Sequence, residues 1–221
     1  MLQKKHFFLK KIFFRIATFC YTLESYRLDM TDSELVQQIL NGNSNAFRYL
    51  VSKNQQLVVH IVGRIVRQQE DLEDICQEVF IKVYRKLEKF RGDSKLSTWI
   101  ATIAYNTAIS KFRKNNRLGE VEFDEQFEIE PDLKTPAAIV EQEEAKKYLL
   151  EMIEQLPVNY RAVLTLFHLQ EFSYREIEQI TGMPEGTVKS YLSRARGLLK
   201  NKLEEFSKSE KSNIFARYAE S

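Results

Sequence analysis

The chain has 221 residues, a length that suits one large domain or two small ones. Hydrophobic residues make up 43% of it, enough for folded cores, and with only 7 Gly and 4 Pro and no period-2 pattern the sequence predicts an all-α fold. Two cysteines, Cys20 and Cys76, exclude a disulfide framework and a zinc site, and the three histidines lack ligand spacing. No metal or other cofactor is therefore expected, and the composition suits a reducing cytoplasm.

The charge is unevenly distributed along the chain, although the net charge is only +2. Residues 82–117 carry ten Lys or Arg against two acidic residues, a local charge of +8. Residues 118–135 carry seven acidic residues against Lys134 alone, a local charge of −6. This asymmetry predicts two modules joined by a flexible acidic linker at 118–135. The modules are placed at 30–117 and 136–205, and a C-terminal tail follows at 206–221.

Residues 1–29 combine six Lys or Arg and two acidic residues with five interleaved phenylalanines. Cations at positions 10, 11 and 15 interrupt the apolar run that a secretory signal needs, and the segment is too short and too charged to span a bilayer. One interpretation is an amphipathic helix on a membrane surface. We favour the other, in which Met30 is the true start and the preceding residues are a non-native or disordered extension.

Regular helical spacing of the apolar residues begins at Thr31. Thr31 and Glu34 match a capping box for a first helix, and residues 46–65 continue as a long second one. Asp71 opens a third helix, whose outer face is acidic at its start and basic at its end. This polarity either matches the helix dipole alone or presents two surfaces to two partners.

Residues 90–97 are predicted to form a loop, with Gly92 and Asp93 as turn residues, before a helix that begins at about Ser97. One stripe of this helix carries Trp99, Thr102, Asn106 and Arg113. Aromatic faces stack on bases and cations follow the backbone in proteins that bind single-stranded DNA. An amide can hydrogen-bond an extruded base. The alternative is that Trp99 covers the hydrophobic core.

The second module is predicted to contain four helices, the first over about 136–155 and the next over 158–169. Ser173 and Glu176 then match a capping box, Gly182 suits a left-handed turn, and a last helix begins near Glu185. Two short helices across a Gly-containing turn are typical of a helix-turn-helix.

The last helix has an apolar face and a small polar face. Its inward residues are Val188, Leu192, Ala195 and Leu199. The opposite face holds Gly186, Ser190, Ser193 and Gly197, flanked by Lys189, Arg194 and Arg196. Small polar residues allow close approach to base edges and the cations reach phosphates, so this face predicts DNA binding. The alternative is an ordinary amphipathic helix with a solvated basic face.

Three segments together resemble the extracytoplasmic-function (ECF) sigma factors of bacterial RNA polymerase. They are residues 71–90, the Phe-Arg-Gly-Asp-Ser run from Phe90 with the Thr-Trp-Ile and Ile-Ala-Tyr-Asn-Thr-Ala that follow it, and the closing helix-turn-helix. Their order and spacing are those of the family, over about Thr31 to Leu203. The resemblance implies a first domain that melts the −10 element of a promoter, sigma region 2. It implies a second that binds the −35 element as duplex, sigma region 4.

The resemblance also implies roles for individual residues. A flipped base of the −10 element would be captured and the DNA held open by Phe90, Arg91, Gly92, Asp93, Ser94, Lys95, Leu96, Trp99 and Asn106, with Arg113 on the same stripe. The −35 element would meet Glu185, Gly186, Thr187, Lys189, Ser190, Ser193, Arg194 and Arg196. The family often has Arg in place of Lys189 and a bulky residue in place of Ser193, so the preferred −35 sequence is not predicted.

The partners that the resemblance implies are core RNA polymerase, promoter DNA in duplex and single-stranded form, and an anti-sigma factor. Asp71, Glu73, Asp74, Gln77 and Glu78 match the surface that docks on the coiled coil of the largest polymerase subunit. The flap region of the polymerase is a further expected contact, and the acidic linker would pass through the RNA exit path.

Two other classes of protein are alternatives. An autonomous helix-turn-helix regulator would explain the second module equally well, but it leaves the aromatic and basic loop of the first without a task. A recombinase or nuclease lacks support, since no carboxylates cluster and Asp93 and Asp124 have no partners in sequence. We therefore expect a cytoplasmic sigma factor that is not an enzyme.

Overall fold

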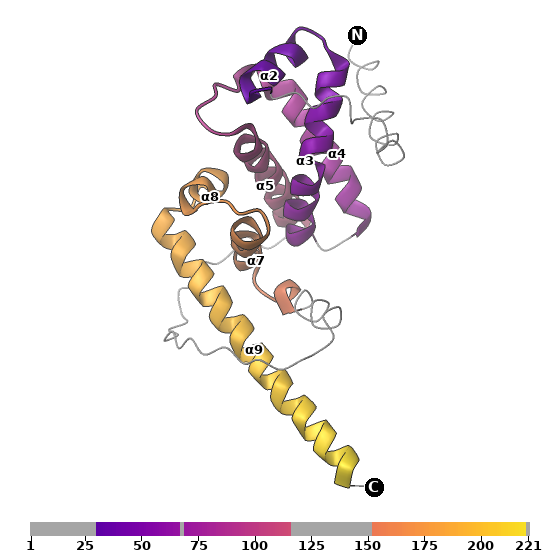
Figure 1. Cartoon of the computed structure of the whole chain (residues 1–221), viewed down its shortest axis with the longest axis vertical. Helices are drawn as coiled ribbons and strands as arrows, with labels where there is room; N and C mark the ends of the chain where they lie inside the picture. Colours follow the sequence, from indigo (N-terminus) through magenta and orange to yellow (C-terminus); the bar gives the residue numbers. More distant parts are fainter. Residues whose placement is uncertain (1–29, 67–68, 116–151, 220–221) are drawn as a thin grey trace. The chain divides into compact units, whose positions relative to one another are not determined.

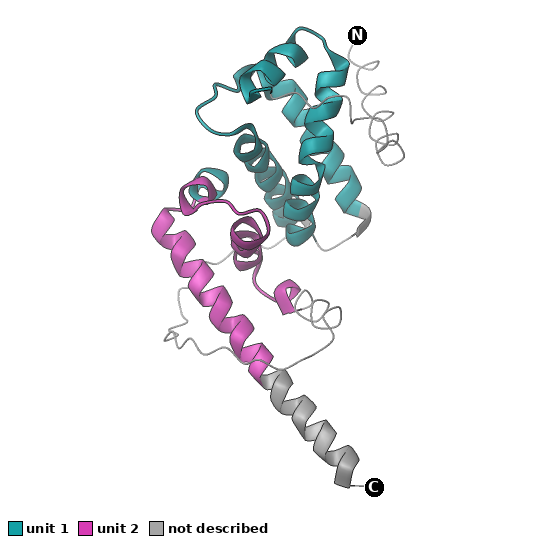
Figure 2. Cartoon of the chain, viewed as in Figure 1, with its two compact units in different colours: residues 1–119, 178–182 teal, residues 120–177, 183–221 magenta. Residues whose placement is uncertain are grey.

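The structure, a computed structural model, describes residues 30–66, 69–115 and 152–219. These residues form helices and no strands, so the all-α prediction is confirmed. Two compact units are present: residues 1–119 with 178–182, and residues 120–177 with 183–221 (Figures 1 and 2). The predictions for residues 1–29 and for the acidic linker fall outside the described residues. Across the described ranges, no helix has the length and apolar character needed to cross a membrane.

The first unit is arranged around its longest helix. Its described elements are α2 (Asp32–Leu40), α3 (Ser44–Ile65), α4 (Gln69–Lys86), the 3₁₀ turn η1 (Leu87–Lys89) and α5 (Leu96–Asn115). α3 packs against α2, α4 and α5, and α4 also packs against α5 (Figure 1). The predicted apolar residues of α3 are buried, with Leu50, Val58 and Val62 fully inaccessible to solvent. The core of this unit therefore lies around α3.

Local capping explains where the first two helices begin. The Thr31 hydroxyl accepts a hydrogen bond from the Glu34 N–H at 3.3 Å, and the Glu34 carboxylate accepts one from the Thr31 N–H at 2.8 Å. The predicted capping box is therefore confirmed, and hydrogen bonds from the Thr31 backbone and side chain lower the pKa of Glu34. For α3, the Asn43 side chain accepts from the N–H groups of Asn45 and Ala46. This second cap was not among the features predicted from the sequence.

After residue 151 the chain forms the last turn of a helix (residues 152–154), α7 (Val158–Leu164), the π-helical turn η2 (Thr165–Leu169), α8 (Tyr174–Thr181) and α9 (Glu185–Ala219). The predicted helix over about 136–155 lies outside the described residues, except for this last turn. The helix predicted over 158–169 is confirmed in extent. Its second half is wider than an α-helix, because the Gln170 N–H bonds to the Thr165 carbonyl, five residues back.

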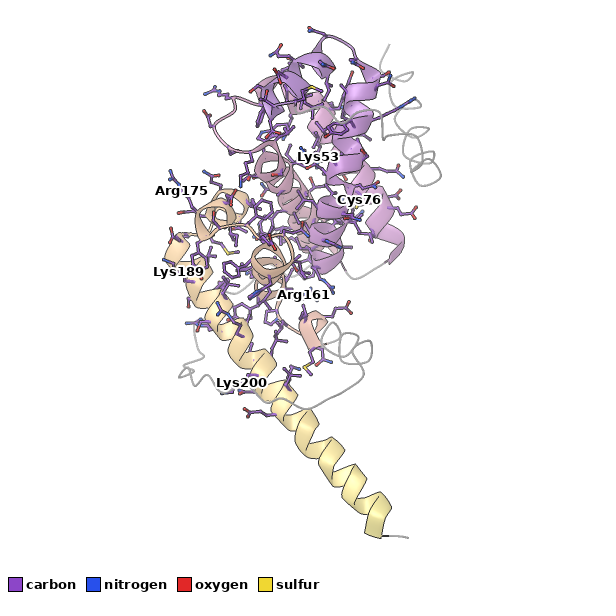
Figure 3. The ribbon with its side chains drawn as sticks, viewed as in Figure 1. Lys53, Cys76, Arg161, Arg175, Lys189 and Lys200 are labelled. Atoms are coloured by element: carbon purple, nitrogen blue, oxygen red, sulfur yellow. The ribbon has the colours of Figure 1, made fainter. Side chains whose placement is uncertain are left out.

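α7 packs against α9 and is also linked to the end of the helix before it. Along its length it packs against α9, where the rings of Tyr160 and Tyr191 meet edge to face with centroids 5.0 Å apart. Arg161, only 2% exposed, donates a hydrogen bond from its Nη1 to the Glu154 carbonyl at 2.7 Å (Figure 3). That carbonyl belongs to the end of the preceding helix, where a cation is favoured. The buried arginine therefore fixes the turn through Pro157.

Candidate nucleic-acid interface

The first candidate surface consists of residues 90–95, between η1 and α5, and the exposed stripe of α5. The rings of Phe90 and Trp99 meet edge to face, with centroids 5.6 Å apart and planes at 66°. Both side chains are half-buried. Trp99 thus packs against Phe90 and still exposes part of its side chain. This result is intermediate between the two interpretations of the sequence, a residue that stacks on DNA and a residue that covers the core. The pair joins the start of the loop to the first turn of α5.

The other residues predicted for this surface differ in exposure. Exposed side chains or backbone are found at Arg91, Gly92, Asp93, Lys95, Asn106 and Arg113, and Ser94 is half-buried. Leu96 differs from the prediction, which placed it in the loop. It is the first residue of α5 and is 3% exposed, so its side chain belongs to the core. The helix begins one residue before Ser97 for two reasons. The Leu96 side chain is buried in the core, and its N–H is capped by a residue distant in sequence.

That distant residue is Asp32, which the sequence did not link to the loop. The Leu96 N–H donates to Asp32 Oδ2 at 2.7 Å, across 64 positions of sequence. In the same region Gly92 has φ of +79°, a left-handed conformation, and a Cβ added there would lie 3.9 Å from Ser33 Oγ. The predicted turn at Gly92 is thus present, and the start of α2 lies beside it.

The acidic start of α4 is the surface predicted to dock on a protein partner. Glu73, Asp74 and Glu78 are exposed, and Asp71 and Gln77 are half-buried. Two of these carboxylates have cationic neighbours: Asp71 Oδ1 lies 3.9 Å from Lys111 Nζ, and Glu78 Oε1 lies 2.7 Å from Lys82 Nζ. Lys82 also donates to the Thr107 hydroxyl at 3.2 Å. These two lysines therefore join α4 to α5 and reduce the negative charge of the patch.

The helix-turn-helix has the local geometry that the sequence predicts. The Ser173 hydroxyl accepts from the Glu176 N–H at 3.3 Å, and the Glu176 carboxylate accepts from the Ser173 N–H at 2.9 Å, which confirms the capping box. Gly182 has φ of +74°, which confirms the left-handed turn after α8. α9 begins at Glu185, as predicted.

The two faces of α9 are also as predicted. Val188, Leu192 and Ala195 are fully buried and Leu199 is 9% exposed. Of the residues predicted to meet the −35 element, four are exposed: Gly186, Lys189, Ser193 and Arg196. The other four are half-buried: Glu185, Thr187, Ser190 and Arg194. A continuous face of small and cationic side chains is therefore accessible on the first three turns of α9.

Lys189 is held by a group of side chains that the sequence analysis missed. The side chain is labelled in Figure 3. Its Nζ lies 2.7 Å from Glu185 Oε1 and 5.3 Å from the centroid of the Tyr174 ring. The Tyr174 ring stacks in turn on Phe167, with centroids 5.0 Å apart and planes at 7°. The hydrogen bond and the charge of Glu185 raise the pKa of Lys189, so the ammonium stays charged. Helical periodicity cannot reveal this group, because its members come from η2, α8 and α9.

Comparisons with known proteins identify the family. The model of sigma-70 region 2 matches residues 50–118, and that of sigma-70 region 4 matches residues 146–199. The ECF RNA polymerase sigma-E factor of Haemophilus influenzae is 34% identical over 183 residues, which cover 79% of this chain and 96% of that protein. The protein of the same name from Escherichia coli K12 is 38% identical over 184 residues, with 79% and 95% coverage.

Solved structures share the fold. The sigma factor RpoE in complex with the anti-sigma factor NepR, from Bartonella quintana, superposes with a TM-score of 0.55 at 26% identity, over 72% of this chain and 96% of that one. CnrH in complex with the cytosolic domain of CnrY gives a TM-score of 0.56 at 20% identity, over 77% and 96%. With both domain models matched in order and relatives covered almost end to end, the chain belongs to the ECF sigma factors of RNA polymerase.

Proposed function

We propose that this sigma factor directs core RNA polymerase to promoters by binding the −35 element as duplex and melting the −10 element. The proposal depends mainly on one observation: the chain has two different surfaces that are suited to binding DNA. One is an aromatic pair, Phe90 and Trp99, beside an exposed basic loop. The other is a helix-turn-helix whose last helix exposes small and cationic residues.

The first surface suits single-stranded DNA. Flipping a base out of the stack costs a few kcal/mol, which stacking and hydrogen bonds in the protein must offset. The half-buried indole of Trp99 offers part of its face for stacking, and Asn106 and Arg113 are exposed on the same helix. We propose that a non-template base enters the loop at residues 90–95, beside Phe90, while Arg113 contacts the displaced strand.

The second surface suits the major groove of duplex DNA. Gly186, Ser190 and Ser193 have short side chains or none, which allows the backbone of α9 to approach base edges. Lys189, Arg194 and Arg196 flank them and would bind phosphates, an arrangement that sets orientation. Glu185 and Thr187, near the N-terminus of α9, complete the surface, because the first residues of a recognition helix enter the groove.

The proposed partners act through separate surfaces. Asp71, Glu73, Asp74, Gln77 and Glu78 would dock on the coiled coil of the largest polymerase subunit, and the second domain would meet the flap region. Polymerase would then hold both DNA-binding domains on one promoter, so that two modest affinities multiply through effective concentration. Two structural relatives were solved with an anti-sigma factor or a cytosolic partner domain, which supports an anti-sigma factor for this protein too. It would act in the cytoplasm as a non-catalytic initiation factor.

The test is transcription with purified core polymerase on genomic DNA, followed by mapping of the 5′ ends. We expect new transcript starts that depend on both the protein and the core enzyme, and that share two sequence elements upstream. A protein that binds palindromic DNA as a dimer, and yields no new starts with core polymerase, would instead be an autonomous regulator.

A further inference from the structure

The loop at residues 90–95 lies beside an element to which the proposed function gives no role, the first turn of α2. α2 packs against η1, which leads into the loop. At the turn of the loop, a Cβ on Gly92 would lie 3.9 Å from Ser33 Oγ. At the end of the loop, the Leu96 N–H donates to Asp32 Oδ2 at 2.7 Å. α2 therefore packs near the entrance of the loop, and its first turn meets the loop at its turn and at its exit.

The hydrogen bond at Leu96 provides α5 with a cap from outside its own sequence. The first N–H groups of a helix have no acceptor within it. The residue before α5 is Lys95, whose side chain has donors and no acceptor, so this side chain cannot accept a hydrogen bond from the first N–H groups of the helix. Asp32 supplies the missing oxygen, and a carboxylate at this position is also favoured by the helix dipole.

Asp32 belongs to two helix starts at once. It is the first residue of α2, which Thr31 caps, and it caps the first residue of α5. Trp99 lies in the first turn of α5, where its N–H bonds to the Lys95 carbonyl at 3.1 Å and its ring meets Phe90. The position of this turn therefore determines where the aromatic pair lies relative to the loop.

We propose, on the basis of the function proposed above, that Asp32 is a positioning residue for promoter melting. It holds residues 90–96 in the shape in which Phe90 and Trp99 accept an unstacked base, without contacting DNA itself. Removal of the carboxylate leaves the Leu96 N–H to water and frees the loop to adopt other shapes. The affinity for single-stranded DNA is then reduced, whereas polymerase binding and duplex binding by α9 do not change.

The experiment uses full-length protein in holoenzyme. Its probe is a single-stranded oligonucleotide with the non-template sequence of a promoter mapped with the wild type. Asp32→Ala should weaken binding of this probe about fivefold, the factor that corresponds to about 1 kcal/mol for a lost helix cap. Asp32→Asn should stay within about twofold of the wild type, because its amide oxygen can still accept from Leu96.

Glu34→Ala is the matched control, because it removes the other carboxylate of the same turn, which hydrogen-bonds to Thr31 and caps α2 alone. It should leave probe binding unchanged. Equal losses for Asp32→Ala and Glu34→Ala, or a parallel loss of core polymerase binding, would show general destabilisation and overturn the proposal. Wild-type probe binding by Asp32→Ala would overturn it as well.

Two further measurements separate this inference from the function on which it rests. Amide exchange in peptides that span residues 90–97 should be faster in Asp32→Ala and unchanged in Glu34→Ala; equal exchange in Asp32→Ala and the wild type contradicts the positioning role. Trp99→Ala tests the loop itself. If Trp99→Ala loses the probe and Asp32→Ala keeps it, only the role of Asp32 fails, whereas normal binding by Trp99→Ala removes the proposed function of the loop.

Discussion

The two candidate DNA-binding surfaces are stabilised by contacts of different range in sequence. The helix-turn-helix depends on near neighbours: Ser173 with Glu176, Glu185 with Lys189, and the left-handed Gly182 between the helices. The loop at residues 90–95 depends on Asp32, which lies 64 positions before Leu96. The caps and the turn of the helix-turn-helix are therefore set by local contacts, although α9 also packs against α7. The loop takes its shape only when α2 is folded beside it.

The largest expected effect concerns Cys76, a reporter for the folding of the first domain. Burial, followed by the charge of Glu73, raises the pKa of Cys76 to about 12. In a Cys20→Ser background, alkylation at pH 8 should be about a thousandfold slower in the native protein than in urea, since an ordinary thiol has a pKa of about 8.5.

The dependence of the loop on its domain predicts how this signal changes with denaturant. Alkylation of Cys76 and loss of probe binding should occur at the same urea concentration, whereas binding of −35 duplex is lost independently. Probe binding lost well before Cys76 reacts would mean that the loop unfolds locally. Because the pKa is raised in the folded state, the contribution of Cys76 to stability is fully present below about pH 8.5 and is lost as pH rises toward 12.

The next largest effect is expected for Trp99→Ala in promoter opening. Stacking of a base on an aromatic side chain contributes about 1–3 kcal/mol, so opening should fall by roughly 5- to 150-fold while −35 binding stays constant. Potassium permanganate reactivity of the −10 thymines measures opening. Asn106→Ala, on the same helix and exposed, should reduce opening less. Normal opening by both variants would remove the melting role from this face of α5.

Gly182→Ala should destabilise the helix-turn-helix through backbone strain alone. A Cβ at this position meets no atom within 4 Å, but the φ of +74° costs a non-glycine residue about 1–2 kcal/mol. Gly186→Ala is the matched control, because it also meets no atom within 4 Å and lies in α9 without a positive φ. The midpoint of thermal unfolding should be lower in Gly182→Ala than in the wild type, and it should not be lower in Gly186→Ala. Equal midpoints would contradict the strain.

The smallest expected effect is that of a single cation on the −35 contact. Arg194→Ala should weaken binding of −35 duplex at every sequence alike and lower the slope of log affinity against log salt by about 1. Lys200→Ala changes a cation of the same helix outside the predicted surface and should leave the slope unaltered. An unchanged slope for Arg194→Ala would exclude a phosphate contact from this residue.

Much of the fold follows from local rules in the sequence. The capping boxes at Thr31 and Ser173, the buried stripe of α9 and the turn at Gly182 each depend on residues within a few positions of one another. Periodicity and capping chemistry act over that range, and the structure confirms each of these predictions.

The features that were missed at the two candidate DNA-binding surfaces require tertiary contact. The cap on Leu96 joins residues 64 positions apart, and the support of Lys189 combines rings from η2 and α8. The π-helical turn at residues 165–169 also left no trace in the apolar pattern, since its width adds one residue without interrupting the hydrophobic run. Residue type alone could suggest candidates for these contacts, but only packing selects the partners.

α9 is one continuous helix of 35 residues, about 50 Å long, from the turn proposed to face DNA to Ala219. Each residue advances a helix by about 100° around its axis. A single residue inserted between positions 200 and 205 would therefore rotate everything beyond it by more than a quarter of a turn, while the first turns of α9, proposed to bind DNA, stay in place. The direction in which the C-terminal end of α9 faces can thus be changed without altering its first turns. A fluorophore or a fused domain attached at that end would report on its rotation about the helix axis.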